Sequence, residues 1–184
     1  MATIDWPCSR CKESIVILYA LLFVFPAAMI MAALSDLRTL TIPNNISIAL
    51  AITFLVLAPF AGLPLKDIGM HGAACALVLT AGIACFACGW LGGGDAKLLA
   101  AGALWVGFDQ LIPFIYHVTL FGGILIVLIL AYRWLVSEQL VTLAGSEWVT
   151  RLHQPGGGVP YGIAIASSAV LIFPDTKLYA LIMA

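Results

Sequence analysis

Residues 15–34 read Ile-Val-Ile-Leu-Tyr-Ala-Leu-Leu-Phe-Val-Phe-Pro-Ala-Ala-Met-Ile-Met-Ala-Ala-Leu, a run without a charged side chain. About 20 apolar residues in a helix are enough to cross the hydrocarbon core of a bilayer. The run exceeds the apolar core of a signal peptide, which has about 7–15 residues, and no Ala-x-Ala-like cleavage site follows it. We therefore interpret it as a retained membrane helix.

The apolar character extends over the whole chain of 184 residues, of which 63% are hydrophobic and 9% are charged, with a net charge of −1. The mean hydropathy is +1.11. A soluble domain has roughly 45–50% apolar and about 25% charged residues, so a soluble globular protein and a disordered chain are both excluded. The charge gives no positive field for nucleic acid, which leaves the lipid bilayer as the expected environment.

Five further apolar runs predict an all-α, polytopic membrane protein with about six transmembrane helices, in one membrane-embedded domain over residues 1–184. Residues 1–14 form an N-terminal tail in this interpretation, and residues 137–158 form an interfacial loop. The run Leu98–Phe108 is too short to be assigned as a span by itself and fits a short buried or re-entrant helix. The five runs are Ile46–Leu63, Ile68–Leu91, Leu98–Phe108, Pro113–Val136 and Val159–Phe173.

The polar stretch from Ser137 to Gln154 has apolar residues spaced for a helix that lies at the membrane interface. The last segment, Leu178–Ala184, is too short to cross and is expected to continue or cap the sixth helix. The interfacial apolar residues are Leu140, Leu143, Trp148, Val149 and Leu152.

No metal or cofactor is expected from the cysteines and histidines. Cys8 and Cys11 form a single Cys-x-x-Cys pair, whereas a structural zinc site needs four ligands. A disulfide and two free thiols both remain open for this pair. The three histidines, His71, His117 and His153, show no ligand spacing.

Two aspartates stand out by their positions. Asp36 lies at the end of the first predicted helix and Asp95 directly follows the third. Two crossings separate them, so both carboxyl groups are expected on the same side of the membrane. Ionisable groups at membrane depth are costly and mark functional sites. Two aspartates in one pocket do not both ionise easily, so one keeps a proton while the other accepts one, which suits activation of water against a peptide carbonyl.

Three glycines, Gly92, Gly93 and Gly94, precede Asp95. Glycine permits close backbone approach and positive φ angles, so we expect these residues to shape the site. Asp95 is expected to open the fourth helix, whose positive dipole end favours an ionised carboxylate. The alternative interpretation is an ordinary interfacial turn capped by Asp95, with Asp36 only marking a loop.

Three motifs resemble those of the membrane aspartic proteases that process type IV prepilins. Residues 92–97, Gly-Gly-Gly-Asp-Ala-Lys, are similar to the family's G-x-G-D-x-K signature. Ser35-Asp36-Leu37-Arg38, followed by Ile42-Pro43-Asn44, resembles the motif of the first aspartate. Residues 160–166, which begin Pro-Tyr-Gly, resemble a Pro-Tyr/Phe-Gly-x-Ala stretch near the family's C-terminus. Their order and spacing match, over about residues 15–173.

The resemblance implies an aspartic endopeptidase with Asp36 and Asp95 as catalytic residues at the cytoplasmic face of the inner membrane. Its substrate would be a pilin precursor whose leader peptide is removed, as in the short peptidases of tight-adherence (Flp-type) pilus systems. N-methyltransferase activity is not expected, because the longer family members associated with it carry two Cys-x-x-Cys pairs. The motifs further imply that seven residues shape the site around the aspartates and contact the substrate: Gly92, Gly93, Gly94, Lys97, Pro160, Tyr161 and Gly162.

Two alternatives remain. The archaeal preflagellin peptidases share the plan with two aspartates. A non-enzymatic transport or assembly subunit could use the same aspartates as a proton relay. Lysine and arginine residues divide evenly between the two sides of the predicted topology, so the cytoplasmic orientation follows from the resemblance alone.

Overall fold

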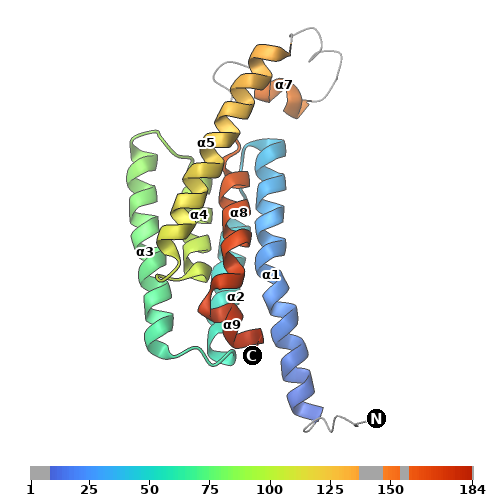
Figure 1. The fold of residues 1–184 in the computed structure, drawn as a ribbon, viewed down its shortest axis with the longest axis vertical. Coiled ribbons are helices and arrows are strands. Elements are labelled where there is room, and N and C mark those ends of the chain that lie inside the picture. Colours follow the sequence, from blue (N-terminus) through green and yellow to red (C-terminus); the bar gives the residue numbers. More distant parts are fainter. Residues whose placement is uncertain (1–8, 137–146, 154–157, 184) are drawn as a thin grey trace.

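The computed structural model describes residues 9–136, 147–153 and 158–183 (Figure 1). Every regular element in these ranges is a helix, which confirms the all-α class. The elements are α1 (Ser9–Thr39), α2 (Asn44–Phe60), α3 (Leu65–Ala87), α4 (Gly93–Val106), α5 (Leu111–Leu135), α7 (Glu147–His153), α8 (Tyr161–Ile172), the 3-10 turn η1 (Phe173–Asp175) and α9 (Lys177–Met183).

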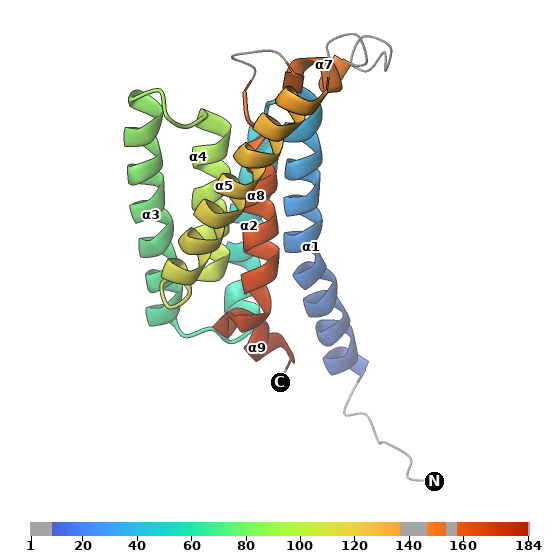
Figure 2. The ribbon, with the colours of Figure 1, turned by 45° about the horizontal axis from the view of Figure 1, so that its top comes forward.

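The long helices run up and down the long axis of the molecule and surround α4 (Figures 1 and 2). Helix α4 contacts α2, α3, α5 and α8, and α1 packs along α8. With 14 residues, α4 is about 21 Å long, less than the roughly 30 Å of a bilayer core. Most of its side chains are buried, so the expectation of a short buried helix is confirmed.

Three helical segments are long and apolar enough to cross a membrane, namely Leu22–Thr39, Leu65–Ala87 and Leu111–Leu135. A fourth is obtained if Tyr161–Asp175 and Lys177–Met183 count as one span, although the two parts are bent by 53°. The structure thus supports a membrane protein but does not confirm the predicted six spans. The C-terminal segment is a separate short helix at an angle to α8, because the helical backbone is interrupted at Thr176, which is extended (φ −83°, ψ 150°).

An aromatic cluster around Trp105 joins four elements in the centre of the bundle. Trp105 of α4 is fully buried and stacks on Phe25 of α1 with ring centroids 4.8 Å apart. Its edge contacts are to Phe54 of α2 and Phe173 of η1, each at 5.9 Å. The indole Nε1–H donates to the backbone oxygen of Leu50 at 2.9 Å, so its one polar group is satisfied inside the bundle.

Helix α7 lies against α5. Val149 and Leu152 of α7 line an apolar groove together with Leu128, Ile129 and Tyr132 of α5. The Nε–H of Arg133 donates to the backbone oxygen of Leu152 at 2.7 Å. A helix is therefore present over residues 147–153 of the predicted interfacial stretch, while Leu140 and Leu143 fall outside the described residues.

We expect Trp105→Ala to lower the free energy of unfolding by about 3–5 kcal/mol, because truncation of a buried aromatic leaves a cavity and here also frees the Leu50 carbonyl. The measurement is reversible unfolding in detergent micelles. Trp134→Ala is the matched control, since Trp134 is 85% exposed and its loss leaves the bundle intact. Equal effects of the two substitutions would contradict the central role of Trp105.

Candidate active site

Asp36 lies in the last turn of α1 and is 4% exposed. Helix α1 ends at Thr39, and the next residue, Leu40, has a φ of +52°, an uncommon backbone conformation for a residue with a side chain. The Ser35 hydroxyl donates to the Thr41 carbonyl at 2.9 Å across this turn. The turn therefore closes α1 sharply and leads the chain back beside Asp36.

Ile42 follows this turn and packs between two glycines from distant parts of the sequence. A Cβ on Gly94 of α4 would lie 3.2 Å from the Ile42 Cβ, and a Cβ on Gly162 of α8 would lie 3.0 Å from the Ile42 Cδ1. The absence of side chains at Gly94 and Gly162 thus lets α1, α4 and α8 converge at one point. This convergence brings the three sequence motifs together.

The backbone of α8 contacts the Asp36 carboxyl directly. The Gly162 N–H donates a hydrogen bond to Asp36 Oδ2 at 2.6 Å. A Cβ on Gly162 would lie only 2.8 Å from the same oxygen, so any side chain at this position would displace the carboxyl group. Gly162 is buried, and the bond is shielded from bulk water.

Asp95 lies in the first turn of α4, as the sequence predicts. Its Oδ1 is buried and has no hydrogen-bond partner in the part of the chain that the structure describes. Burial, and after it the nearby charge of Asp36, raise the pKa of Asp95 to about 7, although a backbone hydrogen bond with Gly92 acts in the opposite direction. The charge of Asp36 acts on Asp95, so the two carboxyl groups lie near enough to interact, and two neighbouring carboxyl groups do not both ionise easily.

The three glycines before Asp95 allow close approach but do not adopt positive φ angles. Gly92 has a φ of −70°, and the glycines with positive φ are Gly62, Gly89 and Gly107. The freedom of glycine to adopt positive φ is therefore not used at residues 92–94, because α4 already begins at Gly93 and takes Gly93 and Gly94 into its first turn. A Cβ on Gly92 would lie 2.7 Å from Asp95 Oδ2, so this glycine makes room for the carboxyl group.

The remaining predicted site residues surround this centre. The exposed Lys97 donates to Asn44 Oδ1 at 2.8 Å and so ties α4 to the start of α2. Pro160 is fully buried and precedes the first residue of α8. Tyr161 packs its hydroxyl end against Gly122 of α5, so it contacts a neighbouring helix and fixes the start of α8.

Sequence reasoning missed the parts played by Ile42, Asn44 and Gly122. Ile42 and Asn44 belong to the Ile-Pro-Asn motif, so the motif itself was the available signal. Gly122, within the apolar stretch of α5, carries no local signal, because its role depends on the Tyr161 ring that fills the space over it.

No group of three or more His, Cys, Asp or Glu side chains among the described residues is arranged to hold a metal ion. Cys75, Cys85 and Cys88 are free thiols. Cys8 falls outside the described residues, as does the side chain of Cys11, so the state of that pair stays open.

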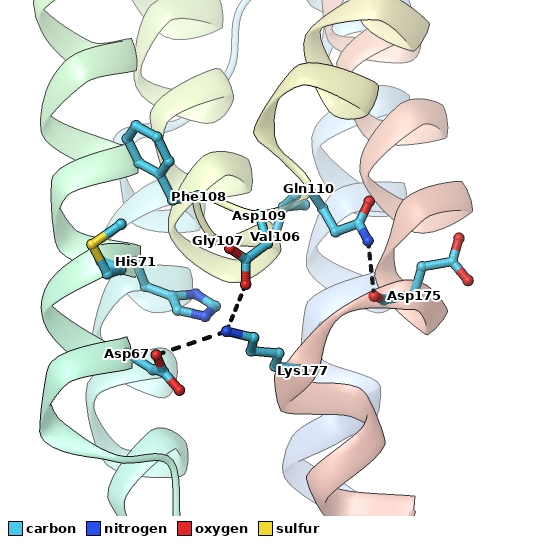
Figure 3. Close-up of a pocket in the computed structure, with 10 residues that line it drawn as sticks. Asp67, His71, Val106, Gly107, Phe108, Asp109, Gln110, Asp175 and Lys177 are labelled. Carbon is cyan, nitrogen blue, oxygen red and sulfur yellow. Dashed lines mark hydrogen bonds and ion pairs between the residues drawn. The ribbon is translucent and has the colours of Figure 1, made fainter.

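A polar pocket of about 250 Å³ lies at the opposite end of the bundle, between α3, the α4–α5 loop and α9 (Figure 3). Lys177 reaches Asp109 at 2.7 Å and Asp67 at 3.8 Å, and its hydrogen bond and charge hold the pKa of Asp109 below its usual range. His71 is buried, stacks on Phe54 and bonds the Leu104 carbonyl through Nδ1 at 2.7 Å. Because Lys177 pairs with Asp109 and Asp67 and His71 bonds the Leu104 carbonyl, we interpret these polar groups as structural contacts between α3, the α4–α5 loop and α9.

The fold and site together define a helical membrane protein with two interacting aspartates near one end of its bundle. The family profile of the type IV leader peptidases matches residues 23–131, more than half of the chain. The protein therefore belongs to the type IV leader peptidase family, as its motifs indicate. No curated protein and no solved structure gives a significant match.

The raised pKa of Asp95 predicts a pH dependence of folding stability. In the folded protein Asp95 binds its proton up to about pH 7, whereas in the unfolded chain it loses the proton near its ordinary value of 3.8. The folded state binds more protons between these values, so stability falls as the pH rises from about 4 to 7.

Unfolding free energies measured across this range should show that fall, and Asp95→Asn should flatten it. Asp109→Asn, which changes an exposed carboxylate at the other end of the bundle, should leave the fall in place. The same slope in the wild type and in Asp95→Asn would show that Asp95 is not the group responsible.

Proposed function

We propose that this member of the leader peptidase family is an aspartic endopeptidase, that Asp36 and Asp95 are its catalytic residues, and that it removes the leader peptide of type IV, Flp-like prepilins. The observation that carries the proposal is the pair itself. Two interacting carboxyl groups occur where α1, α4 and α8 converge: Asp36 is buried, and Asp95 has a buried oxygen without a partner among the described residues.

Such a pair supports hydrolysis of a peptide bond by general acid–base catalysis. The ionised carboxylate takes a proton from a water molecule, whose oxygen bonds to the peptide carbonyl carbon. The neutral carboxyl group donates its proton to the carbonyl oxygen. When the tetrahedral intermediate collapses, the C–N bond breaks and a proton passes to the leaving nitrogen, so that an acid and an amine are released.

The remaining predicted residues have supporting roles in this proposal. Gly94 and Gly162 let the helices approach, and Gly92 makes room for the Asp95 carboxyl. Lys97 fixes the first turn of α4 through Asn44. Pro160 and Tyr161 hold the start of α8 in place. No cofactor is needed for the reaction as written, and methyl transfer is not part of the proposal.

The orientation and the substrate rest on the motifs. The leader of a prepilin is basic and stays inside the cell when its apolar helix inserts, so a site that cuts between leader and helix has to face the cytoplasm. We therefore place the Asp36 and Asp95 end of the bundle at the cytoplasmic face of the inner membrane, with the pocket around Lys177 at the opposite face.

Replacing either aspartate with alanine should lower leader removal by at least about 100-fold, since each variant loses one of the two acid–base groups. Asp→Glu should rescue poorly, because one methylene displaces a carboxyl group and small displacements cost about 100-fold. The measurement is cleavage of a Flp-type prepilin co-expressed with each variant. Asp109→Ala is the control, since this exposed aspartate lies at the other end of the bundle.

This experiment also separates the peptidase from a proton-relay subunit. If the protein were a relay without proteolytic activity, leader removal would not depend on Asp36 or Asp95. Substantial cleavage by either alanine variant, at normal amounts of folded protein, would contradict the catalytic pair.

The orientation can be tested by labelling single cysteines in a variant without the five native ones. Thr39→Cys, three residues after Asp36, should resist a membrane-impermeant thiol reagent in intact cells and react after the membrane is opened. Cys8, restored alone, should react in intact cells, because one predicted crossing separates it from Asp36. The reverse pattern would place the aspartates on the outer face and contradict the prepilin substrate.

A further inference from the structure

The two aspartates of the site have different hydrogen-bonding environments. Asp36 Oδ2 accepts the Gly162 N–H at 2.6 Å, a short bond of the kind made by charged acceptors. The Asp95 carboxyl group also receives a backbone hydrogen bond, from Gly92, but its Oδ1 is buried and has no partner among the described residues. The site is thus asymmetric, although the chemistry of a pair of carboxyl groups does not require it to be.

A backbone N–H can only donate a hydrogen bond, and it stabilises a carboxylate more than a neutral carboxyl group. The Gly162 amide therefore favours the ionised form of Asp36. A buried carboxylate oxygen without a donor is costly, whereas a protonated carboxyl group carries no net charge and supplies its own donor. The environment of Asp95 therefore favours the protonated form.

From this geometry we infer that the shared proton of the pair resides on Asp95, so that Asp36 is the base that activates water and Asp95 is the acid that protonates the peptide carbonyl oxygen. Gly162 is the positioning residue that sets this division through its N–H. The assignment of catalytic roles rests on the proposed peptidase function, while the position of the proton does not. The raised pKa of Asp95 agrees with it.

The bond to Gly162 is built into the fold at several points. The ring and hydroxyl of Tyr161, the residue before it, pack directly on Gly122 of α5. Gly162 itself packs against Ile42. A side chain at Gly162 would lie 2.8 Å from Asp36 Oδ2, so even alanine must push the carboxyl group away from the amide. This gives a single substitution that weakens the bond without changing any charge.

The position of the proton can be measured without substrate by infrared spectroscopy of the full chain in detergent, at about pH 6. Ordinary carboxyl groups are ionised at that pH, so a band from a protonated carboxyl group reports the buried pair. A glutamate carboxyl absorbs at a different frequency from an aspartate carboxyl. We expect Asp95→Glu to shift the band and Asp36→Glu to leave it in place.

A band that shifts in Asp36→Glu alone, a band that shifts equally in both variants, or the absence of a protonated band in the wild type would each overturn the assignment. Because no peptide is cleaved in this measurement, its outcome is independent of the leader-removal assay. If the protein cleaves prepilins but its proton lies on Asp36, the inferred position of the proton is wrong and the proposed peptidase function stands. If the proton lies on Asp95 but the protein cleaves no prepilin, the inferred position stands and the proposed function is wrong.

The part played by Gly162 is tested with Gly162→Ala, in which Asp36→Glu should now also shift the band. Gly158→Ala is the matched control, since a Cβ there would be 3.6 Å from Leu40, an ordinary contact. Its band should respond to Glu substitution as the wild type does. If Gly162→Ala left the response of the band unchanged, the amide would not set the position of the proton.

Discussion

The convergence of α1, α4 and α8 at Ile42 is the constraint on which the site depends. Gly94 and Gly162 leave no space for a side chain there, and the same approach brings the Gly162 amide within 2.6 Å of Asp36. A methyl group at Gly162 would displace the Asp36 carboxyl group, and one at Gly94 would press on Ile42 at 3.2 Å, so that Ile42 would have to shift by a few tenths of an ångström. Helix packing in lipid depends on close contact between small residues. At these two glycines the same close packing also positions the polar groups of the site.

The short central helix α4 explains why a carboxyl group can lie at this depth. A helix of 14 residues surrounded by four others exposes little of itself to lipid, so its first turn can carry Asp95 without placing it among acyl chains. The Trp105 cluster near the other end of α4 fixes the helix along its axis, because Trp105 joins α1, α2 and η1. Core packing and the position of Asp95 are therefore linked through one rigid element.

The sequence predicted the features that depend on local composition. Apolar runs give helices, and the Gly-Gly-Gly-Asp string gives a break followed by a helix start with Asp95 in its first turn. It did not predict features that depend on three-dimensional contacts. The left-handed backbone at Leu40 is set by the turn that closes α1, and the space over Gly122 is filled by a tyrosine 39 positions away. The 53° bend before α9 likewise arises where Phe173 joins the aromatic cluster and Lys177 turns toward Asp109.

The two ends of the bundle treat their charges in opposite ways, and this difference argues for function at one of them. At the α9 end, Lys177 pairs with Asp109 and Asp67, as a structural cluster requires. At the Asp36 end, the motif lysine Lys97 donates to Asn44, and no ion pair with Asp36 or Asp95 is found among the described residues. If the two aspartates had only a structural role, we would expect a lysine or arginine side chain to pair with them. Two carboxyl groups that receive backbone hydrogen bonds, from Gly162 on Asp36 and from Gly92 on Asp95, but no neutralising cation among the described residues, keep a proton available between them, which is what a general acid and base require.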